Sequence, residues 1–146
     1  MIQSYKIDSL KMDIKSLSKK TLDFTIKRLA EIMGIFLIAT SVLLFIALFS
    51  YSPEDPNFIF TENTSIKNLL GFRGSYISDL FFQSIGLISF LMSFTIFFTG
   101  INLIKNKEFL VIVENIFFAI IYFIFGTLFL SHFYSDDFNL YINGNG

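Results

Sequence analysis

A long stretch without charge constrains this chain more than any other feature. No charged residue occurs between Glu31 and Glu54, and the run over 32–50 is almost wholly apolar. It is about as long as the roughly 20 residues that a helix needs to cross the hydrocarbon core of a bilayer. A single segment surrounded by lipid must satisfy its backbone hydrogen bonds within itself, as a helix does. The run therefore predicts a transmembrane helix over residues 32–50.

The turn after this run is equally informative. The two prolines of the chain, Pro53 and Pro56, lie just beyond the last apolar position. Proline lacks an amide donor and disfavours helix in the residue before it. The helix is therefore expected to end at this turn, which consists of Tyr51, Ser52, Pro53, Glu54, Asp55 and Pro56.

Two further apolar runs follow, over 76–104 and 109–131. The first would be longer than a bilayer is thick if it were one helix, so we expect its first turn at the interface. The short link between the runs forces the second to return antiparallel beside the first. The chain is thus predicted to be all-α, an integral membrane bundle with three transmembrane helices. The expected connecting segments are a basic tail over 1–31, an outer loop over 51–75, a cytoplasmic turn over 105–108 and an outer Gly-rich segment over 132–146.

Composition supports this class of protein. Of the 146 residues, 21 are Phe and only 16% are charged, and the mean hydropathy is +0.64. Such a chain has too few polar residues to cover the surface of a soluble domain of this size. Cysteine is absent, which excludes a disulfide framework and a thiolate metal site.

The distribution of basic residues predicts the orientation. Seven of them lie in the tail over 1–31 and two in the turn over 105–108, whereas the loop over 51–75 has two. The positive-inside rule places the tail and the short turn in the cytoplasm. The tail itself has two interpretations. It is either an interfacial amphipathic helix with its cations near anionic headgroups, or a flexible segment that serves only topology.

Asp79 and Glu114 are the only acids within the apolar runs. An ionisable group in a membrane is costly and therefore suggests function. They lie near opposite faces of the membrane in the expected topology, so they cannot form a shared carboxylate site. Each either reaches the interface, accepts hydrogen bonds from neighbouring helices, or serves in a proton or cation pathway. His132 has no Cys or second His beside it, so no metal site is expected, and no catalytic motif is present.

A stripe of small and polar residues marks the second run. Most of its members recur every seven residues, which places them on one side of a helix. Small residues let helix backbones approach closely, and such packing is a main source of association energy in lipid. We therefore expect a helix-packing stripe here, with Phe82, Phe90 and Phe97 on other faces. This small-residue stripe consists of Asp79, Gly86, Ser89, Ser93 and Gly100.

Several segments resemble the N-terminal membrane domain of FtsK/SpoIIIE DNA translocases. In that family the first span ends in a Ser/Thr-Tyr-Ser-Pro-x-Asp-Pro turn, which Ser50, Tyr51, Ser52, Pro53, Asp55 and Pro56 match. Further matching stretches are Lys27-Arg28-Leu29-Ala30-Glu31-Ile32, Asn68-Leu69-Leu70-Gly71, Gly74-Ser75-Tyr76-Ile77-Ser78-Asp79-Leu80-Phe81-Phe82 and Gly86-Leu87. The resemblance covers residues 25–146.

The resemblance implies a membrane anchor for a septal DNA pump. The family's domain has four spans in the bacterial inner membrane, with the N-terminus in the cytoplasm, and is followed by a hexameric ATPase motor. It implies a homo-oligomer at the division septum, division-site partners, and ATP, Mg²⁺ and DNA binding only through a motor that these residues do not contain. No cofactor or enzymatic activity is expected in this chain. The final Asn143-Gly144-Asn145-Gly146 resembles the loop before a fourth span, so a truncated sequence is expected.

A second function stays open. A small stand-alone membrane protein, such as a transport or channel subunit, could use Asp79 or Glu114 to carry an ion. Substitution distinguishes the two functions, because an anchor tolerates the loss of either carboxylate and an ion pathway does not.

Overall fold

The computed structural model describes residues 2–56 and 65–133, with side chains from Lys15 onward. Within them the chain is all-α, as predicted, and has no strand. Part of the expected outer loop and nearly all of the expected outer Gly-rich segment lie outside the described residues. The elements are α1 over Ile2–Phe49, α2 over Gly71–Ile85, the short 3₁₀ helix η1 over Gly86–Ile88, α3 over Ser89–Asn106 and α4 over Leu110–Phe133.

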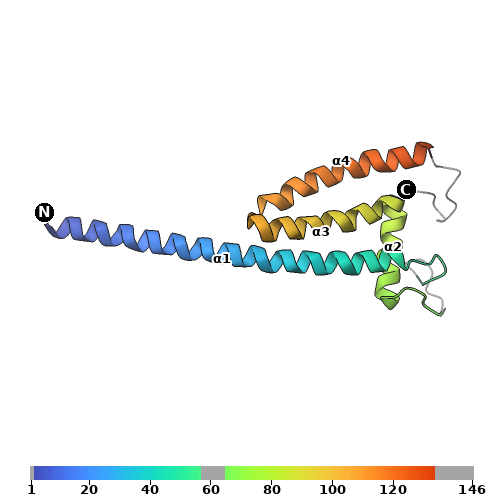
Figure 1. Ribbon diagram of the computed structural model, residues 1–146, viewed down its shortest axis with the longest axis horizontal. Coiled ribbons are helices and arrows are strands. Elements are labelled where there is room, and N and C mark those ends of the chain that lie inside the picture. Colours follow the sequence, from blue (N-terminus) through green and yellow to red (C-terminus); the bar gives the residue numbers. More distant parts are fainter. Residues whose placement is uncertain (1, 57–64, 134–146) are drawn as a thin grey trace.

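The first helix is longer than the predicted span. α1 runs without a break from the basic tail into the apolar run (Figure 1), which agrees with the helical interpretation of the tail and not with a flexible segment. The reason is local, because the tail contains neither Gly nor Pro and nothing in it interrupts a helix. The helix ends at Phe49, where the Ser50 amide still donates to the Ile46 carbonyl at 3.0 Å.

The second predicted helix is divided in two. Instead of one helix over 76–104, α2 begins at Gly71 and stops before Gly86, which has a positive φ of 57°. Such a conformation suits glycine, which has no Cβ. α2 runs across the long axis of the other helices near the C-terminal end of α1 (Figure 1). α3 alone is about 27 Å long at 1.5 Å per residue, close to the thickness of the hydrocarbon core.

The last two helices form an antiparallel pair. α3 ends at Lys107, a left-handed residue with a φ of 57° whose amide donates to the Leu103 carbonyl at 2.9 Å. α4 then returns beside α3, while α1 packs on the other side of α3 (Figure 1). Within the part of the chain that the structure describes, three segments are long and apolar enough to cross a membrane: Lys15–Phe49, Gly71–Asn106 and Leu110–Phe133.

Burial in this bundle follows the pattern of a protein in lipid. The buried face of α2 contains Ser75, Ser78 and Asp79, while Ile77 and Leu80 point outward. On α4, Ala119 is the single buried residue. Large apolar side chains are stable outside only where lipid surrounds them, because water would make such a surface costly.

The apolar core lies where α1 meets α2. Phe82 is buried there with Leu44 and Leu48, and Phe90 packs against them. From the sequence we expected Phe82 and Phe90 to lie on faces other than that of the small-residue stripe. That expectation assumed one straight helix. The break at Gly86 changes the direction of α2, so that the side of α2 with Phe82 faces α1.

Candidate functional site: the turn cluster and the helix contacts

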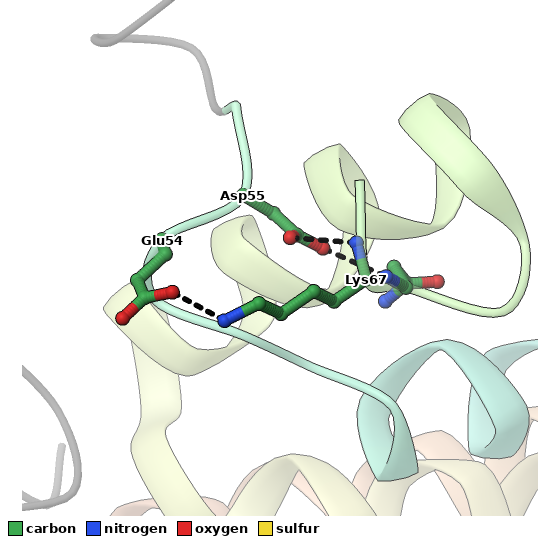
Figure 2. Close-up of polar contacts among 4 residues, drawn as sticks. Glu54, Asp55 and Lys67 are labelled. Carbon is green, nitrogen blue, oxygen red and sulfur yellow. Dashed lines mark hydrogen bonds and ion pairs between the residues drawn. The ribbon is translucent and has the colours of Figure 1, made fainter. Parts of the chain in front are cut away.

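Asp55 organises the turn that follows α1. Its Oδ1 accepts from the Lys67 amide at 2.9 Å and its Oδ2 accepts from the Asn68 amide at 2.8 Å, as Figure 2 shows. The Asp55 side chain is buried. A buried carboxylate that accepts two backbone N–H groups is a strong, charge-assisted connection. It ties the turn to the segment that enters α2.

Asn68 continues this connection into the bundle. Its Nδ2 donates to the Ala47 carbonyl in the last turn of α1 at 2.9 Å, and its Oδ1 accepts from the Leu70 amide at 3.0 Å. The Nδ2 also lies 3.4 Å from Oγ of Ser78 on α2. A Cβ at Gly74 would come within 2.1 Å of the Asn68 Oδ1, so the close contact requires glycine there.

Three more side chains of this region bridge α1, the turn and α2. Ser50 Oγ accepts from the Leu69 amide at 3.1 Å, and Ser75 Oγ donates to the Pro56 carbonyl at 2.7 Å. Tyr51 donates its hydroxyl to Asp79 Oδ1 at 3.2 Å. We use the name turn cluster for these connected side chains, namely Ser50, Tyr51, Asp55, Asn68, Ser75, Ser78 and Asp79.

One ion pair lies on the exposed side of the turn cluster. Glu54 and Lys67 are in contact (Figure 2). The hydrogen bond from Lys67, aided by its charge, holds the pKa of Glu54 below its ordinary value. The hydrogen bond to Glu54, aided by the opposite charge, raises the pKa of Lys67. Both side chains are well exposed, so the pair contributes little to stability.

The two acids of the apolar runs are separated. Asp79 is buried, and its Oδ2 accepts from Gln83 Nε2 at 2.7 Å. Glu114 lies exposed in the first turns of α4. His132 is exposed at the other end of α4. Among residues 2–56 and 65–133, no group of His, Cys, Asp and Glu side chains is suited to hold a metal ion.

The small-residue stripe is divided between two helices. Its five members are buried, with Asp79 on α2 and Gly86 at the break. Ser89, Ser93 and Gly100 lie on the buried side of α3. A Cβ at Gly100 would meet the Gly34 carbonyl oxygen at 2.7 Å, so the backbones of α1 and α3 touch at this point. The stripe is thus located at helix contacts, and its energetic role stays a prediction.

The sequence reasoning missed the matching residues on α1. Ala30, Gly34 and Ser41 are buried along the same helix, and a Cβ at Gly34 would come within 2.8 Å of the Gly100 carbonyl oxygen. Their spacing of four and seven residues was a usable signal, because small residues at such intervals are typical of close helix contacts in membranes. Asn68 and Ser78 were named only within the stretches that resemble the family, and no role was assigned to them, since nothing local distinguishes a buried Asn or Ser from a solvated one.

Polar contacts join α3 to α4. Thr95 and Tyr122 share a hydrogen bond, and Asn115 Nδ2 donates to Thr99 Oγ1 at 2.9 Å. Hydrogen bonds between membrane helices contribute about 0.6 kcal/mol on average. The position of α4 against α3 therefore depends on a few such hydrogen bonds, and the rest of its apolar surface faces lipid.

At the opposite end of the bundle from the turn cluster, Glu31 in the middle of α1 connects this helix to the α3–α4 turn. Its Oε1 lies 2.5 Å from Lys107 Nζ and its Oε2 lies 2.6 Å from Arg28 Nη1. This ion pair places the middle of α1 beside the turn over 105–108. The turn cluster and the contacts of Glu31, at the two ends of the bundle, both position helices. Among the described residues we find no arrangement of nucleophile, base and metal that would perform a reaction.

Comparisons with known proteins identify the relatives. The family described as the 4TM region of DNA translocase FtsK/SpoIIIE matches residues 26–146. The chain is 36% identical over 78 residues to the DNA translocase FtsK of Rickettsia bellii, covering 53% of this chain and 10% of the relative. It is 32% identical to that of Rickettsia prowazekii over 72 residues, 49% of this chain and 10% of the relative. No solved structure gives a significant match.

A third relative, the DNA translocase FtsK of Bradyrhizobium diazoefficiens, is 30% identical over 83 residues, which are 57% of this chain and 10% of that protein. The chain thus spans about a tenth of the length of the curated relatives that it matches. The helices and the family together support an inner-membrane protein. The family match begins at residue 26 and includes the turn cluster and the three described segments that could cross a membrane, apart from the first residues of Lys15–Phe49. The chain therefore belongs to the FtsK/SpoIIIE family through its 4TM membrane region.

Proposed function

We propose that this chain is the membrane anchor of a DNA translocase and holds the motor at the division septum, where chromosome segregation is coupled to cell division. The match of residues 26–146 to the membrane region of the family is the observation that carries this proposal. ATP, Mg²⁺ and DNA bind only to the motor, which is a separate part of such a protein. The chain itself contacts lipid, further copies of itself and division-site proteins.

The described contacts support a rigid anchor. Asp55 and Asn68 connect the entry of α2 to the end of α1, and Gly34 and Gly100 bring α1 and α3 into backbone contact. Forces on one helix are thus transmitted to the others. Rigid attachment is what an anchor needs if a motor pulls on DNA against it.

The proposed orientation has the N-terminus in the cytoplasm. Arg28 and Lys107 both contact Glu31, so the basic tail and the basic turn between α3 and α4 lie at the same end of the bundle. This agrees with the positive-inside rule, which favours cytoplasmic Lys and Arg. The turn cluster then lies at the periplasmic end.

Localisation tests the proposal directly. We would join a fluorescent protein to the N-terminus of this chain, express it in a dividing bacterium and image live cells. An anchor of this kind gives a band at mid-cell, whereas a three-span control protein with the same tag labels the whole membrane. Uniform labelling by both proteins would contradict a septal role.

A second measurement separates an anchor from a stand-alone protein. An immunoblot of the source cells with an antibody against Met1–Lys20 reports the mass of the native product. We expect a band several times larger than 16.8 kDa, because a motor follows the anchor. A band at 16.8 kDa would favour a small independent membrane protein.

The alternative ion-carrying function depends on Asp79 or Glu114. Asp79 is buried and has hydrogen-bond partners in Tyr51 and Gln83, while Glu114 is exposed on α4. We expect Asp79→Asn and Glu114→Gln to keep septal localisation and division. Loss of activity by either variant with normal insertion would instead favour an ion pathway.

A further inference from the structure

α2 lies across the bundle instead of along it. α1, α3 and α4 run along one long axis, and α2 crosses that axis near the C-terminal end of α1 (Figure 1). α3 by itself is about as long as the hydrocarbon core is thick, so the segment Gly71–Asn106 can cross a bilayer without α2. With the three long helices across the membrane, the axis of α2 lies close to the membrane plane.

The contacts of α2 place it at the level where the apolar run of α1 ends. Phe82 of α2 packs against Leu44 and Leu48 of α1. Leu44 lies five residues before the end of α1 at Phe49, which is about 8 Å of helix. Amphipathic helices in a membrane interface bury their apolar side to a depth of about 5 to 10 Å. α2 is therefore at the depth of the interface and not at the centre of the membrane.

The two faces of α2 differ as such a position requires. Its inner face carries three buried side chains of the turn cluster, Ser75, Ser78 and Asp79. The face that points away from α1 carries large apolar side chains instead. Water does not stabilise an apolar surface of this kind, whereas the acyl chains just below the lipid headgroups do. We call this surface the outer face of α2, and its apolar residues are Phe72, Ile77 and Leu80, which are 48%, 45% and 59% exposed.

Polar side chains on the outer face are of the kinds that suit lipid headgroups. The ring of Tyr76 lies against that of Phe72, with 4.4 Å between the centroids, and Tyr is enriched at membrane interfaces. Arg73 lies four residues before Ile77 and so on the same side of the helix. It is exposed and forms no ion pair with any residue that the structure describes. A long Arg side chain can reach lipid phosphates while its helix lies among the acyl chains.

We propose that α2 is an interfacial helix whose outer face binds the phospholipids of one leaflet, with its axis in the plane of the membrane. Lipid is the occupant because the same bilayer surrounds the exposed apolar sides of α3 and α4, and this surface continues onto α2. Of the segment Gly71–Asn106, only α3 then crosses the membrane. The leaflet is the outer one in the orientation proposed above, but the depth of α2 does not depend on the proposed function.

Single tryptophans test the depth of α2, because the chain has no Trp of its own. Each variant is reconstituted in phosphatidylcholine vesicles whose acyl chains carry bromine, a quencher of Trp fluorescence, either near the headgroup or near the chain end. Phe72 and Leu80 are eight residues apart, which would be about 12 Å in depth if α2 crossed the membrane. We expect Phe72→Trp and Leu80→Trp to be quenched equally, and several-fold more by bromine near the headgroup.

α3 provides the matched control pair. Leu91 and Phe98 are 46% and 57% exposed, and their seven-residue separation is about 10 Å along a helix that crosses the membrane. We expect Leu91→Trp to be quenched more by bromine near the headgroup and Phe98→Trp more by bromine near the chain end. Ile77→Trp is a third probe of the outer face, and we expect it to match Phe72→Trp even if one of the other α2 variants does not fold.

Three results would overturn the proposal. A difference between Phe72→Trp and Leu80→Trp as large as that between Leu91→Trp and Phe98→Trp would show that α2 crosses the membrane. Stronger quenching of the α2 variants by bromine near the chain end would place α2 too deep for the interface. No quenching by either lipid would show that water or another protein covers the outer face.

This proposal and the septal role fail separately, because the depth of α2 is measured in vesicles and localisation is measured in cells. Shallow and equal quenching of the α2 variants, in a protein that labels the whole cell membrane evenly, would support the interfacial helix and overturn the septal role. A band at mid-cell together with unequal quenching of Phe72→Trp and Leu80→Trp would do the reverse.

Discussion

The contact between α1 and α3 and the turn cluster stabilise the same bundle by different means. At Gly34 and Gly100 the two backbones touch, and the contact depends on the absence of side chains. In the turn cluster, Asp55 and Asn68 are hydrogen-bonded to backbone groups. Helices in lipid have satisfied backbones and gain energy by close packing, whereas a turn has backbone groups that need partners.

The largest effect is expected where the backbones touch. Gly100→Leu places a side chain against the Gly34 carbonyl and Ile38, and such overpacking costs about 1 to 3 kcal/mol, here at the upper end because backbone atoms block the added side chain. The free energy of unfolding, measured by SDS titration in mixed micelles, should fall accordingly. If Gly100→Leu were as stable as the wild type, α1 and α3 would not be in backbone contact.

A glycine pair provides the control for this prediction. Gly126→Ala meets only the flexible end of Ile88, whose Cδ1 would lie 2.8 Å from the new Cβ. Gly100→Ala meets backbone atoms instead, with the Gly34 oxygen at 2.7 Å. Because both substitutions gain the same helix propensity, we expect Gly100→Ala to be clearly less stable than Gly126→Ala.

The turn cluster is expected to be next in magnitude. Asp55→Ala leaves the amides of Lys67 and Asn68 without their acceptors, which costs about 2 to 3 kcal/mol. Asp55→Asn keeps one acceptor oxygen and should lose less. The same SDS titration measures both variants, and an unchanged stability of Asp55→Ala would show that water replaces the carboxylate.

A smaller effect is expected at the junction between the two regions. Gly86 connects α2, which contributes to the turn cluster, to α3, which packs on α1. Its φ of 57° is unfavourable for a residue with a Cβ, so Gly86→Ala should cost about 1 to 2 kcal/mol. Ser84→Ala, an exposed change two residues away, is the control, and equal stability of the two variants would contradict a strained junction.

The smallest effect concerns the ion pair at the turn. Glu54 has a lowered pKa because Lys67 hydrogen-bonds to it, so its contribution is present above the ordinary carboxyl pKa and is lost as the pH falls through the lowered one. Because the pKa of Lys67 is raised, the contribution of the ion pair to stability is lost at high pH only as the pH rises through that raised pKa. Glu54→Gln should therefore differ slightly from the wild type at neutral pH and match it in acid. A large difference at neutral pH would show that the pair is more than a surface contact.

Local patterns in the sequence predicted much of the fold. The uncharged run over 32–50 and the prolines after it predicted a membrane helix that ends before Tyr51, and α1 ends at Phe49. The all-α bundle and the resemblance to FtsK/SpoIIIE were confirmed. The sequence left the extent of α1 toward the N-terminus open between a helix and a flexible tail, because a basic segment without Gly or Pro is compatible with both.

The candidate site was only partly predictable. The turn residues and the small-residue stripe were identified from motif and spacing, but their partners Asn68, Gly34 and Ser41 were not. A break at Gly86 requires a particular φ, and glycine in a sequence permits this φ without demanding it. Once the break occurs, it turns α2 and brings Phe82 against Leu44 and Leu48.

The sequence by itself determined that this chain enters the membrane as helices and where the apolar runs end, because transfer of charge and of unpaired backbone groups into lipid is costly at every position. Only the tertiary structure decided which residues meet. The contacts of Gly34 with Gly100 and of Asp55 with the Lys67 amide join residues far apart in the chain. Such contacts depend on the direction in which each helix leaves its turn, and no local pattern specifies that direction.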